Sequence, residues 1–232
     1  LIGALIACAT LAIVPVPEPD RTGAELPHLW REMKEGAVIL LRYRQIMWLI
    51  LASTAAMVFY MPLSSYFPLM TSSYFSLSAW HGSLVEFLFA AGIVLASAVM
   101  GGVTIKRDPL ALCYLGMLGL GVTSLLCGLL PALPWCFWLY AGLCLLMGAC
   151  SPLYNIPLTA YMQGNIPQEA QGRAFSLMGS LMSLAMPVGL FLSGPICEKA
   201  GVSAWFFITG AAICLIVVIC RLLAIRDKRR HP

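Results

Sequence analysis

Glu86 is the one acidic residue inside a long apolar segment of this 232-residue chain. The segment begins near Ala79, which places Glu86 about seven residues, or roughly 10 Å, along a helix. A charged side chain at that depth in hydrocarbon costs on the order of 3 kcal/mol. Apolar surroundings favour the neutral form of a carboxyl group, so Glu86 is predicted to bind and release protons. The alternative is a protonated structural residue that hydrogen-bonds to a neighbouring helix.

The residues that share a helical face with Glu86 are small or polar. Gly82, Ser83 and Ala90 lie three or four residues from it, and Ser97 follows further on. Such residues are typical of a helix-packing or cavity face in a membrane protein. The pattern therefore favours a protein-facing or cavity-facing carboxyl group over a lipid-facing one.

Polar residues recur at helical spacing in three other apolar segments, together with prolines such as Pro62, Pro157 and Pro187. Prolines interrupt helical hydrogen bonding, and broken helices beside polar groups often line transport paths. Ser and Thr, however, also join membrane helices to each other. Both interpretations remain for the substrate-path candidates, which are Tyr60, Ser64, Asn155, Thr159, Gln163 and Ser183.

The remaining reactive residue types form no catalytic or metal-binding pattern. The three histidines, His28, His81 and His231, are widely separated, and no nucleophile elbow, HExxH or phosphate loop occurs. The nine cysteines form no CxxC pair, so they are interpreted as small apolar packing residues. No catalytic residue, cofactor or metal is predicted, and an integral membrane enzyme is disfavoured.

The composition requires a lipid environment. The chain is 60% hydrophobic and 10% charged, with a mean hydropathy of +0.88. Soluble domains are about 25% charged, so this chain has too few charges to cover a water-exposed surface. The prediction is an all-α polytopic membrane helix bundle.

Six apolar segments are long enough to cross a bilayer. They are expected at roughly 46–70, 79–102, 110–130, 135–162, 172–195 and 202–224. The opening LIGALIACATLAIV, residues 1–14, is shorter than the about 20 residues that a span needs and lacks the features of a signal peptide. It is interpreted as the end of a preceding transmembrane helix, and the chain as a fragment.

Four regions follow from this division. Residues 1–14 end a helix, 15–44 are a cytoplasmic linker, 45–225 are the six-helix bundle, and 226–232 are a basic cytoplasmic tail. In the linker, apolar residues recur every three or four positions and indicate an amphipathic helix. This helix lies either on the membrane surface or against cytoplasmic loops.

The basic residues set the orientation. When 15–44 is cytoplasmic and each segment crosses once, thirteen of the fourteen Lys and Arg residues are cytoplasmic, and only Lys199 is not. This asymmetry is the positive-inside rule, and it places the C-terminus in the cytoplasm. The net charge of +4 thus reflects topology, and nucleic-acid binding is not predicted.

Residues 151–176, SPLYNIPLTAYMQGNIPQEAQGRAFS, resemble the junction of the tenth and eleventh helices of the major facilitator superfamily. The similar branch is that of drug exporters, which includes macrolide efflux proteins and the enterobactin exporter. The elements that carry the resemblance are Pro152, Asn155, Pro157, Gln163, Ile166-Pro167 and Gln171-Gly172-Arg173. GGVTIKR at 101–107 resembles a degenerate copy of the superfamily's basic loop motif, without the usual Asp.

This resemblance implies the C-terminal half of a twelve-helix secondary transporter in the bacterial inner membrane. The complete carrier would export amphiphilic small molecules, drug-like or siderophore-like, in exchange for protons. Its partners would be the bilayer, the substrate, protons and the missing N-terminal half. Lys106, Arg107 and Arg173 would have gating or anchoring roles. The alternative is a membrane scaffold or receptor with the same fold that does not transport.

Overall fold

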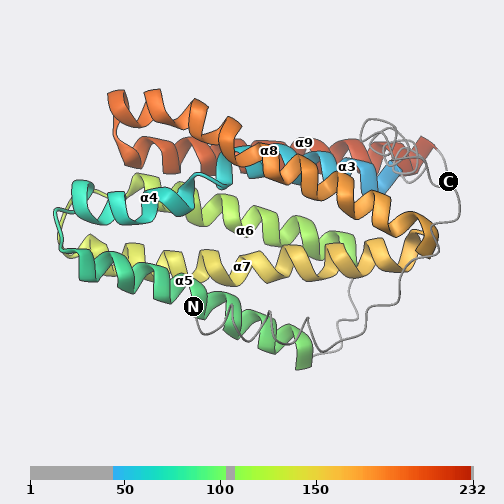
Figure 1. Ribbon diagram of the computed structural model, residues 1–232, viewed down its shortest axis with the longest axis horizontal. Helices are drawn as coiled ribbons and strands as arrows, with labels where there is room; N and C mark the ends of the chain where they lie inside the picture. Colours follow the sequence, from blue (N-terminus) through green and yellow to red (C-terminus); the bar gives the residue numbers. More distant parts are fainter. Residues whose placement is uncertain (1–43, 103–107, 231–232) are drawn as a thin grey trace, which may run out of the picture.

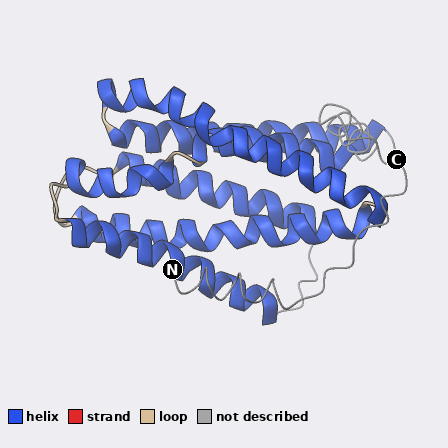
Figure 2. Ribbon diagram, viewed as in Figure 1, coloured by secondary structure: helices blue, strands red, loops and turns tan. Residues whose placement is uncertain are grey.

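Six long apolar helical stretches make up the described part of the chain, residues 44–102 and 108–230 of the computed structural model. Each is long and apolar enough to cross a membrane, which confirms the six predicted spans. Helices and short connections account for all described residues (Figure 2). The elements are α3 (Arg44–Tyr60), α4 (Leu63–Leu69), the π-helical turn η1 (Met70–Tyr74), α5 (Ala79–Gly102), α6 (Pro109–Leu129), α7 (Cys136–Asn165), α8 (Gln168–Ala200) and α9 (Val202–Arg230).

The expected helix end at 1–14 and nearly all of the expected linker at 15–44 lie outside the described residues. Two helices are longer than expected. Helix α8 starts at Gln168 and runs to Ala200, and α9 continues to Arg230, through part of the stretch expected as a basic tail. The apolar windows alone could not show these extensions, because helical hydrogen bonding continues into polar residues at the membrane surface.

The helix ends follow from local sequence. Asp108 accepts a hydrogen bond from the backbone N–H of Leu110 at 3.1 Å, and Pro109 starts α6, where its missing N–H costs nothing. Ile166 is extended and ends α7, because the proline that follows disfavours a helical conformation. Gly201 ends α8 with a φ of +84°, which suits a residue without Cβ.

Proline interrupts only one of the described spans. Pro62 separates α3 from α4, as the sequence predicted. Helix α7, however, continues through Pro152 and Pro157, and α8 continues through Pro187 and Pro195. The expectation of broken helices is wrong for these two spans. A proline leaves one carbonyl of the preceding turn without its helical N–H partner, and neighbouring membrane helices can satisfy such a group, so the helix continues.

The bundle is built around α6, which packs between α7 and α9 (Figure 1). Helix α5 covers α7, and α3 packs against both α8 and α9. Glycine permits close approaches between helices: a Cβ on Gly116 of α6 would lie 2.6 Å from the backbone nitrogen of Tyr154 in α7. Helices α5 and α8 are the least covered of the six spans.

The two ends of the bundle differ. The connections at 75–78 and 130–135 and the Gly201 turn lie together at one end (Figure 1), which we call the aromatic end. The Ile166–Pro167 connection lies at the opposite end. Helices α5 and α7 both start at the aromatic end and therefore run parallel to each other.

Candidate functional site

Three polar residues that the sequence suggested for a substrate path lie along one face of α7. Asn155, Thr159 and Gln163 are four residues apart, which places them on nearly the same face of the helix. Together with Ile156 and Ala160 they line a cavity of about 370 Å³. The structure thus brings together three of the six residues that the sequence suggested for a substrate path.

The lining of this cavity is polar but uncharged. It offers two side-chain amides and one hydroxyl, beside an isoleucine and an alanine. Amides and hydroxyls both donate and accept hydrogen bonds. Asn155 and Gln163 are exposed and Thr159 is half-buried, so their polar groups are open to a ligand. An amphiphilic molecule with neutral polar groups suits this surface.

Glu86 lies on α5 and is exposed, but it does not belong to this cavity. Gly92 of α5 packs against Leu145 and Ala149 of α7. Glu86 lies six residues from Gly92 towards the aromatic end, and Asn155 lies six residues from Ala149 towards the opposite end. At about 1.5 Å per residue, the two sites are roughly 18 Å apart along the bundle.

Tyr60 and Ser64 flank the break at Pro62 and have different environments. The Tyr60 hydroxyl is buried and has no hydrogen-bond partner among the described residues. The Ser64 hydroxyl is exposed and donates to the carbonyl of Met61 at 3.0 Å. Tyr60 therefore retains a free polar group inside the bundle, whereas Ser64 is already bonded within its own helix.

Ser183 and the basic candidates lie elsewhere. Ser183 is exposed on α8, outside the residues that line the cavity. Arg173 is exposed near the start of α8, at the opposite end. Lys106 and Arg107 fall in the stretch 103–107, outside the described residues.

Gln171, part of the sequence motif at 151–176, shapes the turn next to the cavity. Its side-chain amide donates to the carbonyl of Gln163 at 2.8 Å and to that of Ile166 at 2.9 Å. These bonds close the connection between α7 and α8. Gln171 therefore positions the end of α7 that carries Gln163.

Sequence reasoning missed the residues that hold the helix break. Thr209 of α9 donates to the carbonyl of Phe59 at 3.1 Å. The hydroxyls of Tyr66 in α4 and Ser193 in α8 lie 2.8 Å apart in a hydrogen bond. Both contacts join residues more than 120 positions apart, so helical spacing gave no signal for them.

Among the residues that the structure describes, no group of three or more His, Cys, Asp or Glu side chains could hold a metal ion. The eight cysteines described are all free. Five of them are buried and three are half-buried, as expected for packing residues in apolar segments.

The family model of the Major Facilitator Superfamily matches residues 1–190 and 115–232 of the chain. Macrolide efflux protein A of Streptococcus pyogenes is 37% identical over 226 residues, which are 96% of this chain and 55% of that protein. Macrolide efflux protein A of Enterococcus faecalis is 37% identical over 193 residues, 82% of this chain and 58% of that protein.

A shorter match covers part of the chain. Multidrug efflux pump Tap of Mycolicibacterium fortuitum is 36% identical over 104 residues, 45% of this chain and 24% of that pump. No solved structure matches the chain significantly. The chain spans about half the length of the macrolide efflux proteins that it matches.

Proposed function

Because the chain belongs to the major facilitator superfamily, we propose that it is the C-terminal half of a proton-coupled exporter of amphiphilic small molecules. The observation that carries this proposal is the cavity lined by Asn155, Thr159 and Gln163. It offers neutral hydrogen-bonding groups beside apolar ones, in a helix long and apolar enough to cross a membrane. The names of the macrolide efflux relatives make a macrolide the first substrate to test.

In this proposal Glu86 carries the proton. An exposed carboxylate in hydrocarbon costs on the order of 3 kcal/mol, so its side of α5 needs cover from protein or from water. The other half of the carrier supplies that cover. A proton moving inwards contributes about 2.3 kcal/mol per 100 mV of membrane potential, and protonation of Glu86 links this energy to substrate release.

The orientation follows from the basic residues. Arg173 near the start of α8 and Arg226 near the end of α9 lie at the opposite end of the bundle, and by the positive-inside rule we assign this end to the cytoplasm. The cavity then belongs to the cytoplasmic half of α7, and Glu86 to the outer half of α5. Substrate entering from the cytoplasm meets the cavity first. Protons entering from outside meet Glu86 first.

The test is macrolide efflux from cells that express the full-length carrier containing this chain, with and without a protonophore. We expect efflux to collapse with the protonophore and to be strongly reduced by Glu86→Gln, which keeps the shape of the side chain but cannot ionise. Glu198→Gln is the matched control, because Glu198 is also exposed but lies at the end of α8.

The outcomes separate the parts of the proposal. Efflux that resists both the protonophore and Glu86→Gln would remove proton coupling and leave the substrate path. Efflux reduced equally by Glu86→Gln and Glu198→Gln would assign the loss to general charge effects. A correctly inserted carrier with no efflux of any amphiphile would favour a non-transporting scaffold or receptor.

A further inference from the structure

Three tyrosine hydroxyls inside the bundle have no hydrogen-bond partner among the residues that the structure describes. They belong to Tyr60 of α3 and to Tyr140 and Tyr154 of α7. Tyr140 and Tyr154 are fully buried, and the hydroxyl of Tyr60 is buried although the residue as a whole is half-buried. A buried hydroxyl without a partner costs free energy, and such groups are rare in folded proteins.

The two tyrosines of α7 lie on one side of that helix. Tyr140 and Tyr154 are fourteen residues apart, which is nearly four helical turns, so they share nearly the same face over about 21 Å. Cys144 and Met147 lie between them on this face and are fully buried. The face therefore looks into the bundle, whereas Asn155, the residue after Tyr154, lines the cavity.

Tyr60 meets this face from α3. Its hydroxyl lies near the thiol of Cys144, and so does the hydroxyl of Tyr140. Tyr154 extends in the other direction, towards α3, where its hydroxyl lies near Ser53. Tyr60 also packs against both apolar clusters of the bundle, one of which contains Tyr140 and the other Tyr154. The three hydroxyls thus line one region between α3 and α7, which we call the tyrosine seam.

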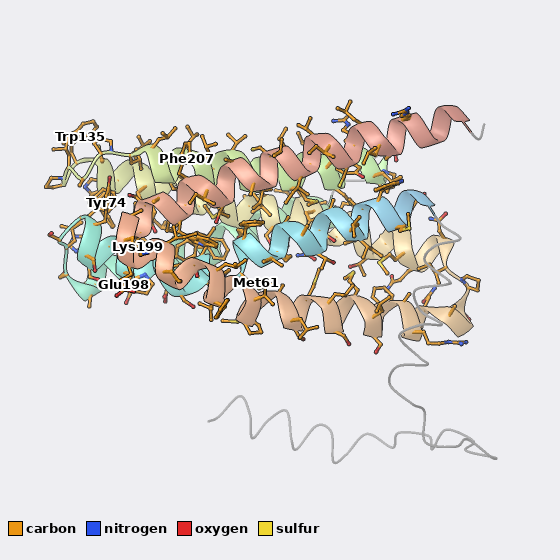
Figure 3. The ribbon with its side chains drawn as sticks, turned by 90° about the horizontal axis from the view of Figure 1, so that it is seen from above. Met61, Tyr74, Trp135, Glu198, Lys199 and Phe207 are labelled. Carbon is orange, nitrogen blue, oxygen red and sulfur yellow. The ribbon has the colours of Figure 1, made fainter. Side chains whose placement is uncertain are left out.

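The backbone leaves room in this seam. Helix α3 packs on α8 and α9, and α7 packs on α5 and α6, whereas α3 and α7 scarcely approach each other. Side chains alone therefore occupy the space between these two helices. Figure 3 shows Met61, the neighbour of Tyr60, within the length of the bundle, whereas Tyr74 and Trp135 lie at its aromatic end. The seam is accordingly an interior feature.

The seam extends between the levels of the two candidate sites. Glu86 lies six residues before Gly92, and Tyr140 lies five residues before Leu145, which Gly92 contacts. Because α5 and α7 run parallel, Glu86 and Tyr140 lie at about the same height in the bundle. At the other end of the seam, Tyr154 directly precedes a residue that lines the cavity.

Water is the ligand that suits these groups. A phenol hydroxyl both donates and accepts hydrogen bonds, whereas a thiol is weak in both roles, so Cys144 is a poor partner for Tyr60 and Tyr140. The enclosed position of the hydroxyls admits only a small molecule. A buried water typically makes about three hydrogen bonds to polar groups that would otherwise lack a partner.

We propose that Tyr60, Tyr140 and Tyr154 bind internal water molecules between α3 and α7. The bundle then has a hydrated interior that extends from the level of Glu86 to the level of the cavity. This water site does not depend on the proposed transport activity, because it rests on the buried hydroxyls alone.

Hydroxyl-radical footprinting with X-rays tests for the bound water, in the full-length carrier containing this chain. The beam converts water into hydroxyl radicals, which oxidise the side chains that touch it, whether buried or not. Because buried water stays at its polar partners, we expect Tyr60, Tyr140 and Tyr154 to be oxidised more than about threefold faster than two buried methionines. These are Met70 and Met162, which are fully buried and of a type that is easily oxidised.

Removal of one hydroxyl gives a second measurement. Tyr140→Phe keeps the ring, and we expect oxidation at Tyr60 to fall about twofold and the thermal midpoint to decrease, since the bound water loses a partner. Tyr66→Phe is the matched control, because the Tyr66 hydroxyl already bonds to Ser193, and it should leave oxidation at Tyr60 unchanged. If Tyr140→Phe does not fold, Tyr154→Phe gives the same comparison.

Three results overturn the proposal. Oxidation of the tyrosines no faster than that of the two methionines would show a dry interior. An unchanged or higher thermal midpoint in Tyr140→Phe would show that its hydroxyl has no partner to lose, because removal of such a group relieves a desolvation cost. An equal fall of oxidation at Tyr60 in Tyr66→Phe would assign the effect to loosened packing.

Discussion

The hydroxyl of Thr209 in α9 donates a hydrogen bond of 3.1 Å to the backbone carbonyl of Phe59, in the last turn of α3 before the helix break at Pro62. Helix α3 ends at Tyr60, and the last carbonyls of a helix have no helical N–H partner, so they need other partners. Thr209 provides one of them from a helix about 150 residues away in the chain. The break is therefore supported by tertiary contacts.

Replacement of Thr209 should weaken the bundle by a small, measurable amount. Thr209→Val keeps the shape but removes the hydroxyl, and we expect a loss of about 1 kcal/mol in the free energy of unfolding. Thr209→Ser keeps the donor and should lose less. Unfolding in mixed detergent micelles gives both values; equal stability of the valine and native chains would show that the bond contributes nothing.

Gly116 should tolerate no larger side chain. A Cβ at this position would lie 2.6 Å from the Tyr154 nitrogen, so Gly116→Ala forces α6 and α7 apart and should cost about 1–3 kcal/mol. Gly142→Ala is the control, since nothing lies within 4 Å of a Cβ there and alanine favours a helix. Similar thermal stability of both variants would contradict the close approach.

Gln171 should stabilise the turn between α7 and α8. Gln171→Ala removes both of its hydrogen bonds to carbonyls, and we expect faster proteolysis at 163–168 and a loss of about 1 kcal/mol in stability. Gln163 contributes only its backbone carbonyl to the turn, so Gln163→Ala should leave proteolysis unchanged. Equal cleavage rates for the two variants would exclude this role.

Asn155 should affect transport without affecting stability. Asn155→Ala removes an exposed amide from the cavity, and loss of one hydrogen bond of about 1 kcal/mol corresponds to a roughly fivefold rise in the KM for the exported substrate. The control is Asn165→Ala, because the Asn165 amide donates to the Tyr161 carbonyl at 2.8 Å and Asn165 is not among the residues that line the cavity. An equal rise in both variants would argue against substrate contact at Asn155.

The six spans could be predicted from the sequence because the information is local. A membrane helix needs about 20 apolar residues and satisfies its backbone hydrogen bonds within itself. Each apolar segment can therefore be identified as a helix from its own residues. The same applies to the shared face of Asn155, Thr159 and Gln163, which depends only on helical spacing.

Relations between helices could not be predicted in this way. Pro62 and Pro157 were equal reasons to expect a helix break, yet only Pro62 interrupts its helix. The separation of Glu86 from Asn155 depends on how α5 and α7 meet at Gly92 and Ala149. Such contacts join residues that are distant in the chain, and their energies depend on packing geometry rather than on any periodic pattern.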